Sequence, residues 1–302
     1  MKKNIKTSLV RQTRTLDPYI MMAPFLILFI YFTIIPILSS IALSFTYFDM
    51  IHLPQFIGLM NYTRMFLEDD VFIKSLSNTF VFAVITGPIG YIMCFVFAWL
   101  INDLNPRIRA FMTFLFYAPT ISGSLYVIWT FLFSGDSYGF INGNLMRLGL
   151  LNEPVQWLSD PRYILTIIMI VQIWLSLGAS FLSFIAGLQN VDKALYEAGA
   201  IDGIRNRWQE LFMITLPSMG PQLQFGAVIQ IGASLSVGTV AIALAGYPST
   251  DYAAETVITH IMDVGNLRYE MGYASAISVF LFVLLLFTHF ILRKVLRKIA
   301  RD

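Results

Sequence analysis

Polar side chains that could hold a solute recur in two otherwise apolar stretches of the chain. In each stretch they are spaced by four residues, and side chains four apart lie on one face of a helix. Amides and hydroxyls can hydrogen-bond the hydroxyl groups of a neutral solute, and an aromatic ring can stack on its C–H face. The candidates are Gln172, Trp174, Ser176 and Ser180 in the first stretch and Gln230 and Ser234 in the second.

The alternative role for these residues is packing between helices. Small and hydroxyl-bearing residues are common at the contacts between membrane helices, so packing is an equal alternative for any single serine. It is a weaker alternative for Gln172 and Gln230, because a lipid-facing amide would cost several kcal/mol.

The chain lacks the patterns of catalysis and nucleotide binding. A phosphate-binding P-loop needs Gly-Lys followed by Ser or Thr, and the sequence contains no Gly-Lys dipeptide. Its three histidines are scattered, and its one cysteine, Cys94, excludes a disulfide framework or a cysteine-based metal site. We therefore expect a non-catalytic chain without a cofactor or metal of its own.

The elements that position the candidates are membrane helices. Hydrophobic residues make up 57% of the 302 residues and charged residues 13%, about half the charge of a soluble protein. This composition excludes a soluble enzyme, a disordered chain and a nucleic-acid binder. Six uncharged stretches each exceed the ~20 residues that span a bilayer, and they do not alternate as barrel strands do. The sequence predicts an all-α polytopic membrane protein with six transmembrane helices, near residues 20–46, 76–101, 110–133, 163–188, 222–246 and 272–292.

The distribution of charge predicts the orientation in the membrane. With the N-terminus in the cytoplasm, 15 of the 20 Lys and Arg residues lie on the cytoplasmic side, as positively charged loops usually do. The basic segments 1–19 and 293–302 are then both cytoplasmic. No predicted span contains a charged residue, which argues against an ion-coupled carrier and favours an uncharged solute such as a sugar.

The longest cytoplasmic connection, residues 189–221, has the composition of two short helices. Asp192 is a good N-cap, and Gly203 suits the left-handed residue that ends a helix. A second amphipathic helix is predicted from about Arg205 to Leu216-Pro217, where the proline should stop it. Mixed charges on its polar side favour a protein partner over the alternative, a helix resting on lipid, which would have a basic face.

This 189–221 loop resembles the EAA loop of binding-protein-dependent ABC importer permeases. The resemblance is carried by Glu197-Ala198-Gly199-Ala200-Ile201-Asp202-Gly203, which is followed by Ile214-Thr215-Leu216-Pro217. Its position between the fourth and fifth of six spans makes the motif specific. Stretches typical of the sugar-type subgroup cover residues 20–295: Ala23-Pro24-Phe25, Phe56-Ile57-Gly58-Leu59-Met60-Asn61-Tyr62, Tyr117-Ala118-Pro119, Gly139-Phe140-Ile141-Asn142 and Gly272-Tyr273-Ala274-Ser275-Ala276-Ile277.

The resemblance implies a type I (MetI-like) permease domain over residues 20–292 in the bacterial plasma membrane. The implied partners are a second homologous permease, two copies of a cytoplasmic ATPase that holds ATP and Mg²⁺, and an extracellular or periplasmic solute-binding protein. The implied substrate is a carbohydrate. By the resemblance, the residues that couple the loop to the ATPase are Glu197, Ala198, Gly199, Asp202, Gly203, Leu216 and Pro217, and the alignment carries the substrate pathway to the region of the polar candidates above.

Two departures from the family pattern affect the loop. Gly199 stands where an alanine is common, which should loosen the helix by about 1 kcal/mol. The interval from Gly203 to Pro217 is one residue longer than the commonest form, so no contact is predicted for Trp208 or Glu210.

Other functions remain open at this point. Within the same family, the substrate could be a neutral solute other than a carbohydrate, or glycerol phosphate. In a different class, the chain could be a self-sufficient carrier or channel, although the uncharged spans and the specific loop disfavour it. A membrane enzyme is a more distant alternative.

Overall fold

The computed structural model describes residues 19–122 and 125–299, which form two compact units. One unit contains the described residues up to Arg64 together with Val264–Phe280, and the other contains Met65–Asp263 together with the residues from Leu281 onward. The predicted N-terminal segment 1–19 and the end of the tail 293–302 lie largely outside the described residues.

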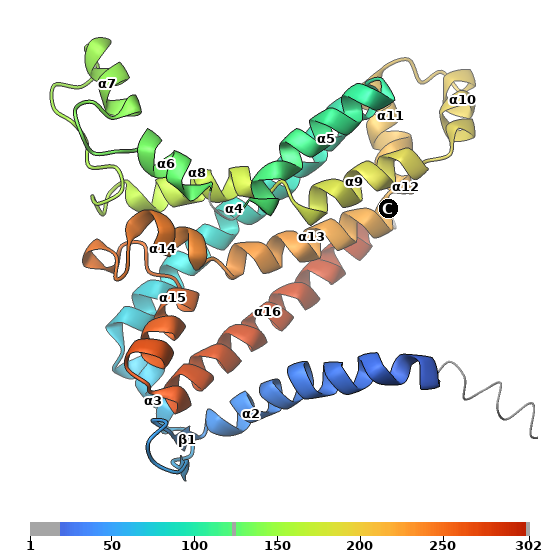
Figure 1. Cartoon of the computed structure of the whole chain (residues 1–302). Coiled ribbons are helices and arrows are strands. Elements are labelled where there is room, and N and C mark those ends of the chain that lie inside the picture. Colours follow the sequence, from blue (N-terminus) through green and yellow to red (C-terminus); the bar gives the residue numbers. More distant parts are fainter. Residues whose placement is uncertain (1–18, 123–124, 300–302) are drawn as a thin grey trace, which may run out of the picture. The chain divides into compact units, whose positions relative to one another are not determined.

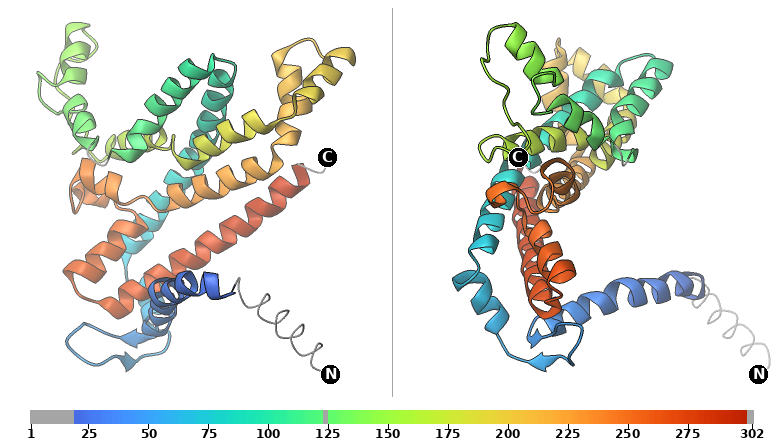
Figure 2. Two further views of the ribbon diagram at one scale, coloured as in Figure 1. Left: turned by 45° about the vertical axis from the view of Figure 1, so that its right-hand side comes forward. Right: turned by 60° about the vertical axis from the view of Figure 1, so that its left-hand side comes forward.

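The larger unit is entirely helical in its described part (Figures 1 and 2). Its elements in chain order are α4 (Asp70–Asn102), α5 (Pro106–Ile121), α6 (Tyr126–Leu132), α7 (Phe140–Arg147), α8 (Ile164–Leu175), α9 (Ala179–Asn190), α10 (Lys193–Ile201), α11 (Arg207–Glu210), the π-helical η2 (Leu211–Thr215), α12 (Leu216–Ser218), α13 (Gly220–Leu235), α14 (Thr239–Ala245), the 3₁₀ turn η3 (Thr250–Tyr252) and α15 (Val257–Met262).

The smaller unit begins with a helix from Tyr19 to Leu43. This helix includes the π-helical η1 (Ile30–Ile34) and α2 (Ile35–Leu43). It is followed by the strands β1 (Thr46–Tyr47) and β2 (Gln55–Phe56). The strands pair antiparallel. Three elements extend across the division between the units: α3 (Met60–Leu67), η4 (Asp263–Leu267) and α16 (Met271–Ile299).

The apolar helices agree with the predicted all-α membrane fold, but two spans are not continuous. Four helices are long and apolar enough to cross a membrane: Tyr19–Leu43, Asp70–Asn102, Ile164–Asn190 and Met271–Leu292. The number reaches six if each of two bent pairs, α5 with α6 and α13 with α14, counts as one span. The spans predicted near 110–133 and 222–246 each coincide with one of these bent pairs. The second pair bends by 42° at the break between Leu235 and Thr239, where Gly238 has the non-helical dihedral angles φ −143° and ψ −57°.

The core of the larger unit is formed by α4, α9 and α13, each of which packs against the other two. Figure 2 shows α9 and α13 running side by side. Phe184 is fully buried there and meets Tyr91 and Phe95 of α4 at ring-centroid distances of 5.3 and 5.7 Å. A Cβ atom at Gly226 of α13 would lie 2.4 Å from the Phe184 ring. Glycine therefore allows the two helices to approach closely.

Candidate functional site

The N-terminal half of the 189–221 loop folds as predicted. The Asp192 carboxylate accepts a hydrogen bond from the Ala194 N–H at 3.0 Å and caps α10. Gly203 has φ +94°, and the Ile204 N–H donates to the Gly199 carbonyl at 2.9 Å. This is the hydrogen-bond pattern of a Schellman motif, which favours glycine at the left-handed position. The sharp elbow after α10 is thus fixed by local sequence.

Gly199 has a packing role that the sequence did not reveal. A Cβ atom at this position would lie 2.7 Å from Ile214 Cδ1 and 3.0 Å from Ile204 Cδ1. The missing side chain lets α10 lie directly against η2. The sequence predicted only that Gly199 would loosen the helix. In the structure its missing side chain also lets the two halves of the loop come into contact.

The C-terminal half of the loop differs from the prediction, because the helix does not stop at Leu216-Pro217. The chain widens into η2, where the Leu216 N–H donates to the Leu211 carbonyl five residues earlier. Pro217 then lies in the first turn of α12, where a missing N–H costs no hydrogen bond. The regular helix breaks instead at Met219, with φ −97° and ψ 14°.

The coupling candidates divide into exposed and packed residues. Glu197, Ala198, Asp202, Gly203 and Pro217 are exposed, Leu216 is half-buried and Gly199 is buried. Two apolar side chains on α10 also face outward: Ile201 is 87% exposed and Leu195 47%. Exposed apolar side chains beside a carboxylate form a surface that can be covered by another protein.

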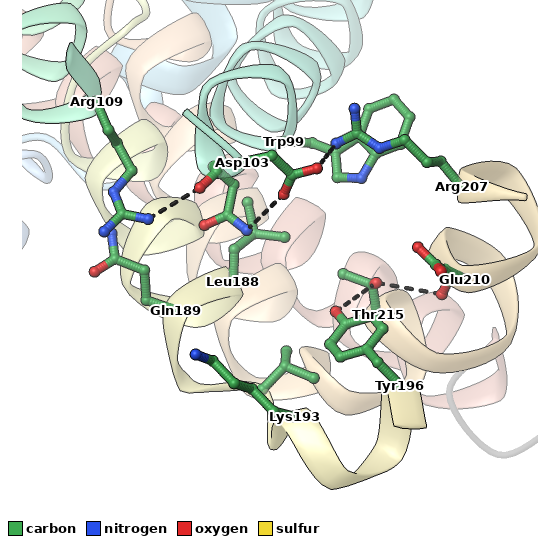
Figure 3. Close-up of a pocket in the computed structure, with 12 residues that line it drawn as sticks. Trp99, Asp103, Arg109, Leu188, Gln189, Lys193, Tyr196, Arg207, Glu210 and Thr215 are labelled. Atoms are coloured by element: carbon green, nitrogen blue, oxygen red, sulfur yellow. Dashed lines mark hydrogen bonds and ion pairs between the residues drawn. The ribbon is translucent and has the colours of Figure 1, made fainter. Parts of the chain in front are cut away.

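A cavity of about 570 Å³ separates α10 from the ends of the core helices (Figure 3). Its lining comes from α4, α5, α9 and the loop itself. On the α10 side, the Tyr196 hydroxyl and the Thr215 Oγ1 are hydrogen-bonded at 2.9 Å. On the opposite side, Arg109 of α5 donates to the Asn102 carbonyl at the end of α4 at 2.9 Å. The first contact joins two parts of the loop, and the second joins α5 to α4.

The polar candidates of the spans lie between α4 and its neighbours. Ser176, Ser180, Gln230 and Ser234 are all buried, with 1–9% of their surface exposed, and we call these four residues the polar belt. Ser180 Oγ donates to the Gly226 carbonyl at 3.0 Å. A Cβ atom at Gly90 of α4 would lie 2.2 Å from Gln230 Nε2 and 2.8 Å from Ser176 Oγ.

The two remaining candidates lie beside the belt. Gln172 and Trp174 are half-buried on α8, and Trp174 packs edge-on against Trp129 at 5.4 Å. The structure brings the polar residues of α8–α9 and α13 together around the glycines of α4. The sequence could not indicate this arrangement, because those glycines are far from the polar residues along the chain. Their role in a substrate pathway stays a prediction.

Comparison with known proteins places these features in a family. Residues 86–301 match the family described as binding-protein-dependent transport system inner membrane component. The probable ABC transporter permease protein YesP of Bacillus subtilis is 31% identical over 264 residues, covering 86% of this chain and 84% of YesP. The lactose transport system permease protein LacF of Rhizobium radiobacter is 28% identical, covering 86% of this chain and 87% of LacF.

A solved structure agrees with the fold. A chain of the bacterial alginate ABC transporter, in complex with an alginate pentasaccharide-bound periplasmic protein, is 26% identical and superposes with a TM-score of 0.80. The match covers 96% of this chain and 97% of the other. With the helical membrane fold and the EAA-type loop, these matches show that the chain belongs to the family of binding-protein-dependent transport system inner membrane components, the permeases of ABC importers.

Proposed function

We propose that this chain forms half of the translocation pathway for a carbohydrate and is driven by a separate ATPase that docks on the 189–221 loop. The observation that carries the proposal is the outward-facing helix α10, with its carboxylate at Glu197 and its exposed Ile201. The proposed assembly contains a second homologous permease, two ATPase copies that hold ATP and Mg²⁺, and an extracellular or periplasmic binding protein. Both termini are then cytoplasmic.

The shape of the loop suits a docking helix. The cap at Asp192 and the elbow at Gly203 fix both ends of α10, so an imposed displacement would move it as a rigid unit. In the assembly, Glu197 would pair with a basic group of the ATPase. Ala198, exposed and small, would permit close approach of the partner surface.

A carbohydrate substrate is supported by the relatives and by the chemistry of the spans. Similar proteins are named as permeases for lactose, arabinooligosaccharides and trehalose/maltose. The predicted spans contain amides, hydroxyls and aromatic rings without charged side chains, which favours a neutral oligosaccharide. Since the polar belt is buried against α4, substrate would reach it only when the core helices separate.

Cross-linking tests the docking proposal. Cysteines would be introduced one at a time along residues 192–210 in a Cys94→Ala background, which removes the one native thiol. We expect them to capture the co-expressed ATPase. The matched control is a cysteine at Tyr138, which is 99% exposed and lies in a predicted outer loop, and it should capture none. Failure at every loop position would contradict the proposal.

Transport assays test the coupling and the substrate. Glu197→Lys should abolish ATP-dependent uptake while leaving membrane insertion intact. Sugar uptake by the chain reconstituted alone would instead favour a self-sufficient carrier. Mass spectrometry of the ligand that copurifies with the intact complex identifies the substrate, and a non-carbohydrate ligand would overturn the carbohydrate assignment.

A further inference from the structure

The second half of the 189–221 loop is attached to the C-terminal end of α4 by four side chains. Arg207 forms an ion pair with Asp103, the residue that ends α4. The Arg207 guanidinium carbon also lies 4.9 Å from the centroid of the Trp99 ring. The Trp208 ring meets the same Trp99 ring at a centroid distance of 5.2 Å. We call Trp99, Asp103, Arg207 and Trp208 the clamp.

The clamp lies on the rim of the cavity that separates α10 from the core helices. Figure 3 shows Arg207 beside Trp99 and Asp103, with Tyr196 and Lys193 of α10 at a distance from them across the open space. The cavity of about 570 Å³ lies between α10 and the ends of α4 and α5, so contacts around the cavity connect α10 to α4. A separate connection is the chain itself, which joins α9 to α10 through Val191 and Asp192.

A continuous set of contacts leads from α10 to the clamp. Tyr196 is hydrogen-bonded to Thr215 at 2.9 Å, and Gly199 allows Ile214 to pack against α10. These contacts join α10 to η2, and η2 continues directly from α11, which carries Arg207 and Trp208. From the clamp the path enters α4, which packs against α9 and α13.

We propose that the clamp transmits movement of the docking helix to α4, so that Arg207, Trp208, Trp99 and Asp103 are positioning residues for coupling between ATP hydrolysis and transport. This inference rests on the proposed function. Two alternative routes for movement would need no clamp: the backbone from α10 through Val191 into α9, and the backbone from η2 through α12 into α13.

The ion pair of the clamp is poorly suited to stabilising the fold, whereas Trp99 packs against the core. The side chains of Arg207 and Asp103 are 50% and 57% exposed, and Trp208 is 61% exposed. Exposed ion pairs contribute little to folding stability. Loss of Arg207 or Asp103 should therefore change coupling while the thermal unfolding temperature stays the same, and this difference distinguishes transmission from structural support.

The test measures sugar transported per ATP hydrolysed in the reconstituted full complex. We expect Arg207→Ala and Asp103→Ala each to lower this ratio about tenfold, the size of a typical coupling between two sites. Assembly with the ATPase and the unfolding temperature should not change. The double exchange Arg207→Asp with Asp103→Arg should recover part of the ratio, because it restores the ion pair but not the contact of Arg207 with the Trp99 ring. Trp99→Phe should retain more coupling than Trp99→Ala, since a ring remains beneath Arg207.

The matched control is a second ion pair, between the exposed Arg162 and the half-buried Asp160, at 2.7 Å. The hydrogen bond from Arg162 holds the pKa of Asp160 below its ordinary value, so this is a formed pair away from the loop. Arg162→Ala should leave the transport ratio unchanged.

The coupling role of the clamp would be overturned by single variants with the wild-type transport ratio, or by a double exchange that recovers none of it. Loss of ATPase capture in Arg207→Ala would also overturn it, because Arg207 would then belong to the docking contact. If the wild-type chain captures no ATPase, the proposed function fails, and the clamp's coupling role fails with it.

Discussion

Two segments lie at opposite ends of α4 and are attached to it by different chemistry. The 247–262 segment is joined to the first turns of α4 by buried hydrogen bonds. Thr79 Oγ1 accepts from the Val257 N–H at 2.9 Å, and the buried His260 contacts Asp69 at 2.9 Å. The 189–221 loop is attached at the other end through the exposed Arg207–Asp103 pair. The 247–262 segment is attached through buried groups, whereas the 189–221 loop is attached through exposed ones.

Buried polar groups explain this difference. Glu255 is 4% exposed and accepts hydrogen bonds from the Ser249 N–H and the Thr259 hydroxyl. Releasing such a segment would leave buried groups unpaired, at about 1–3 kcal/mol for each. Releasing an exposed ion pair costs about 0–1 kcal/mol. The 189–221 loop can therefore detach from α4 at low cost, whereas the 247–262 segment cannot.

The largest effect is expected at the elbow of the open loop. Gly203 has φ +94°, whereas proline fixes φ near −65°. Gly203→Pro should misdirect α10 and abolish transport without preventing membrane insertion, as measured by uptake assays and membrane fractionation. Gly203→Asn is the matched control, because asparagine is the side chain that tolerates positive φ best, and it should retain transport. Normal uptake by Gly203→Pro would show that the elbow is not needed.

The next effect concerns the attached segment. Asn78 Nδ2 lies 3.2 and 2.9 Å from the carbonyl oxygens of Ala253 and Glu255. Asn78→Ala should lower the free energy of unfolding by about 2 kcal/mol, because these carbonyls lose their donor. Thermal unfolding in detergent measures the change. Asn144→Ala removes one exposed bond to the Phe140 carbonyl and should have little effect. Equal stabilities of the two variants would show that the bonds from Asn78 to the 247–262 segment contribute no more than an exposed bond.

A smaller effect is expected in the helix core between the two segments. A methyl group at Gly226 meets the buried Phe184 ring, and overpacking costs about 1–3 kcal/mol. Alanine recovers up to about 1 kcal/mol through its helix propensity, so Gly226→Ala should destabilise the protein by about 1 kcal/mol in the same unfolding assay. The control is Gly232→Ala on the same helix, where a Cβ meets no atom within 4 Å. It should be neutral or stabilising, and the opposite order would contradict the packing described for α9 and α13.

The smallest effect on folding is expected at the tip of α10. Ile201 is 87% exposed, so Ile201→Ser should change the free energy of unfolding by less than about 0.5 kcal/mol. The same variant should capture less ATPase in a pull-down assay, because docking would cover this side chain. A marked loss of stability would show that Ile201 packs within the chain, and unchanged capture would place the docking surface elsewhere.

Local features of the 189–221 loop were predictable from the sequence because they depend on neighbouring residues. The cap at Asp192 and the left-handed Gly203 were both expected and are confirmed. The predicted stop at Pro217 was wrong, because a π-helical stretch removes the need for its N–H. For Trp208 no contact could be predicted, since its partner Trp99 is more than a hundred residues earlier.

The sequence by itself determined that the chain is a helical membrane protein with a specialised loop, because hydropathy, charge and short-range capping are properties of neighbouring residues. The motif in that loop carried the resemblance to importer permeases. Only the tertiary structure decided that Ser176 and Gln230 meet at Gly90, that Gly199 admits Ile214, and that Arg207 reaches Asp103. These contacts join residues far apart in the chain, and they depend on how closely helices approach, which a pattern of residue types does not specify.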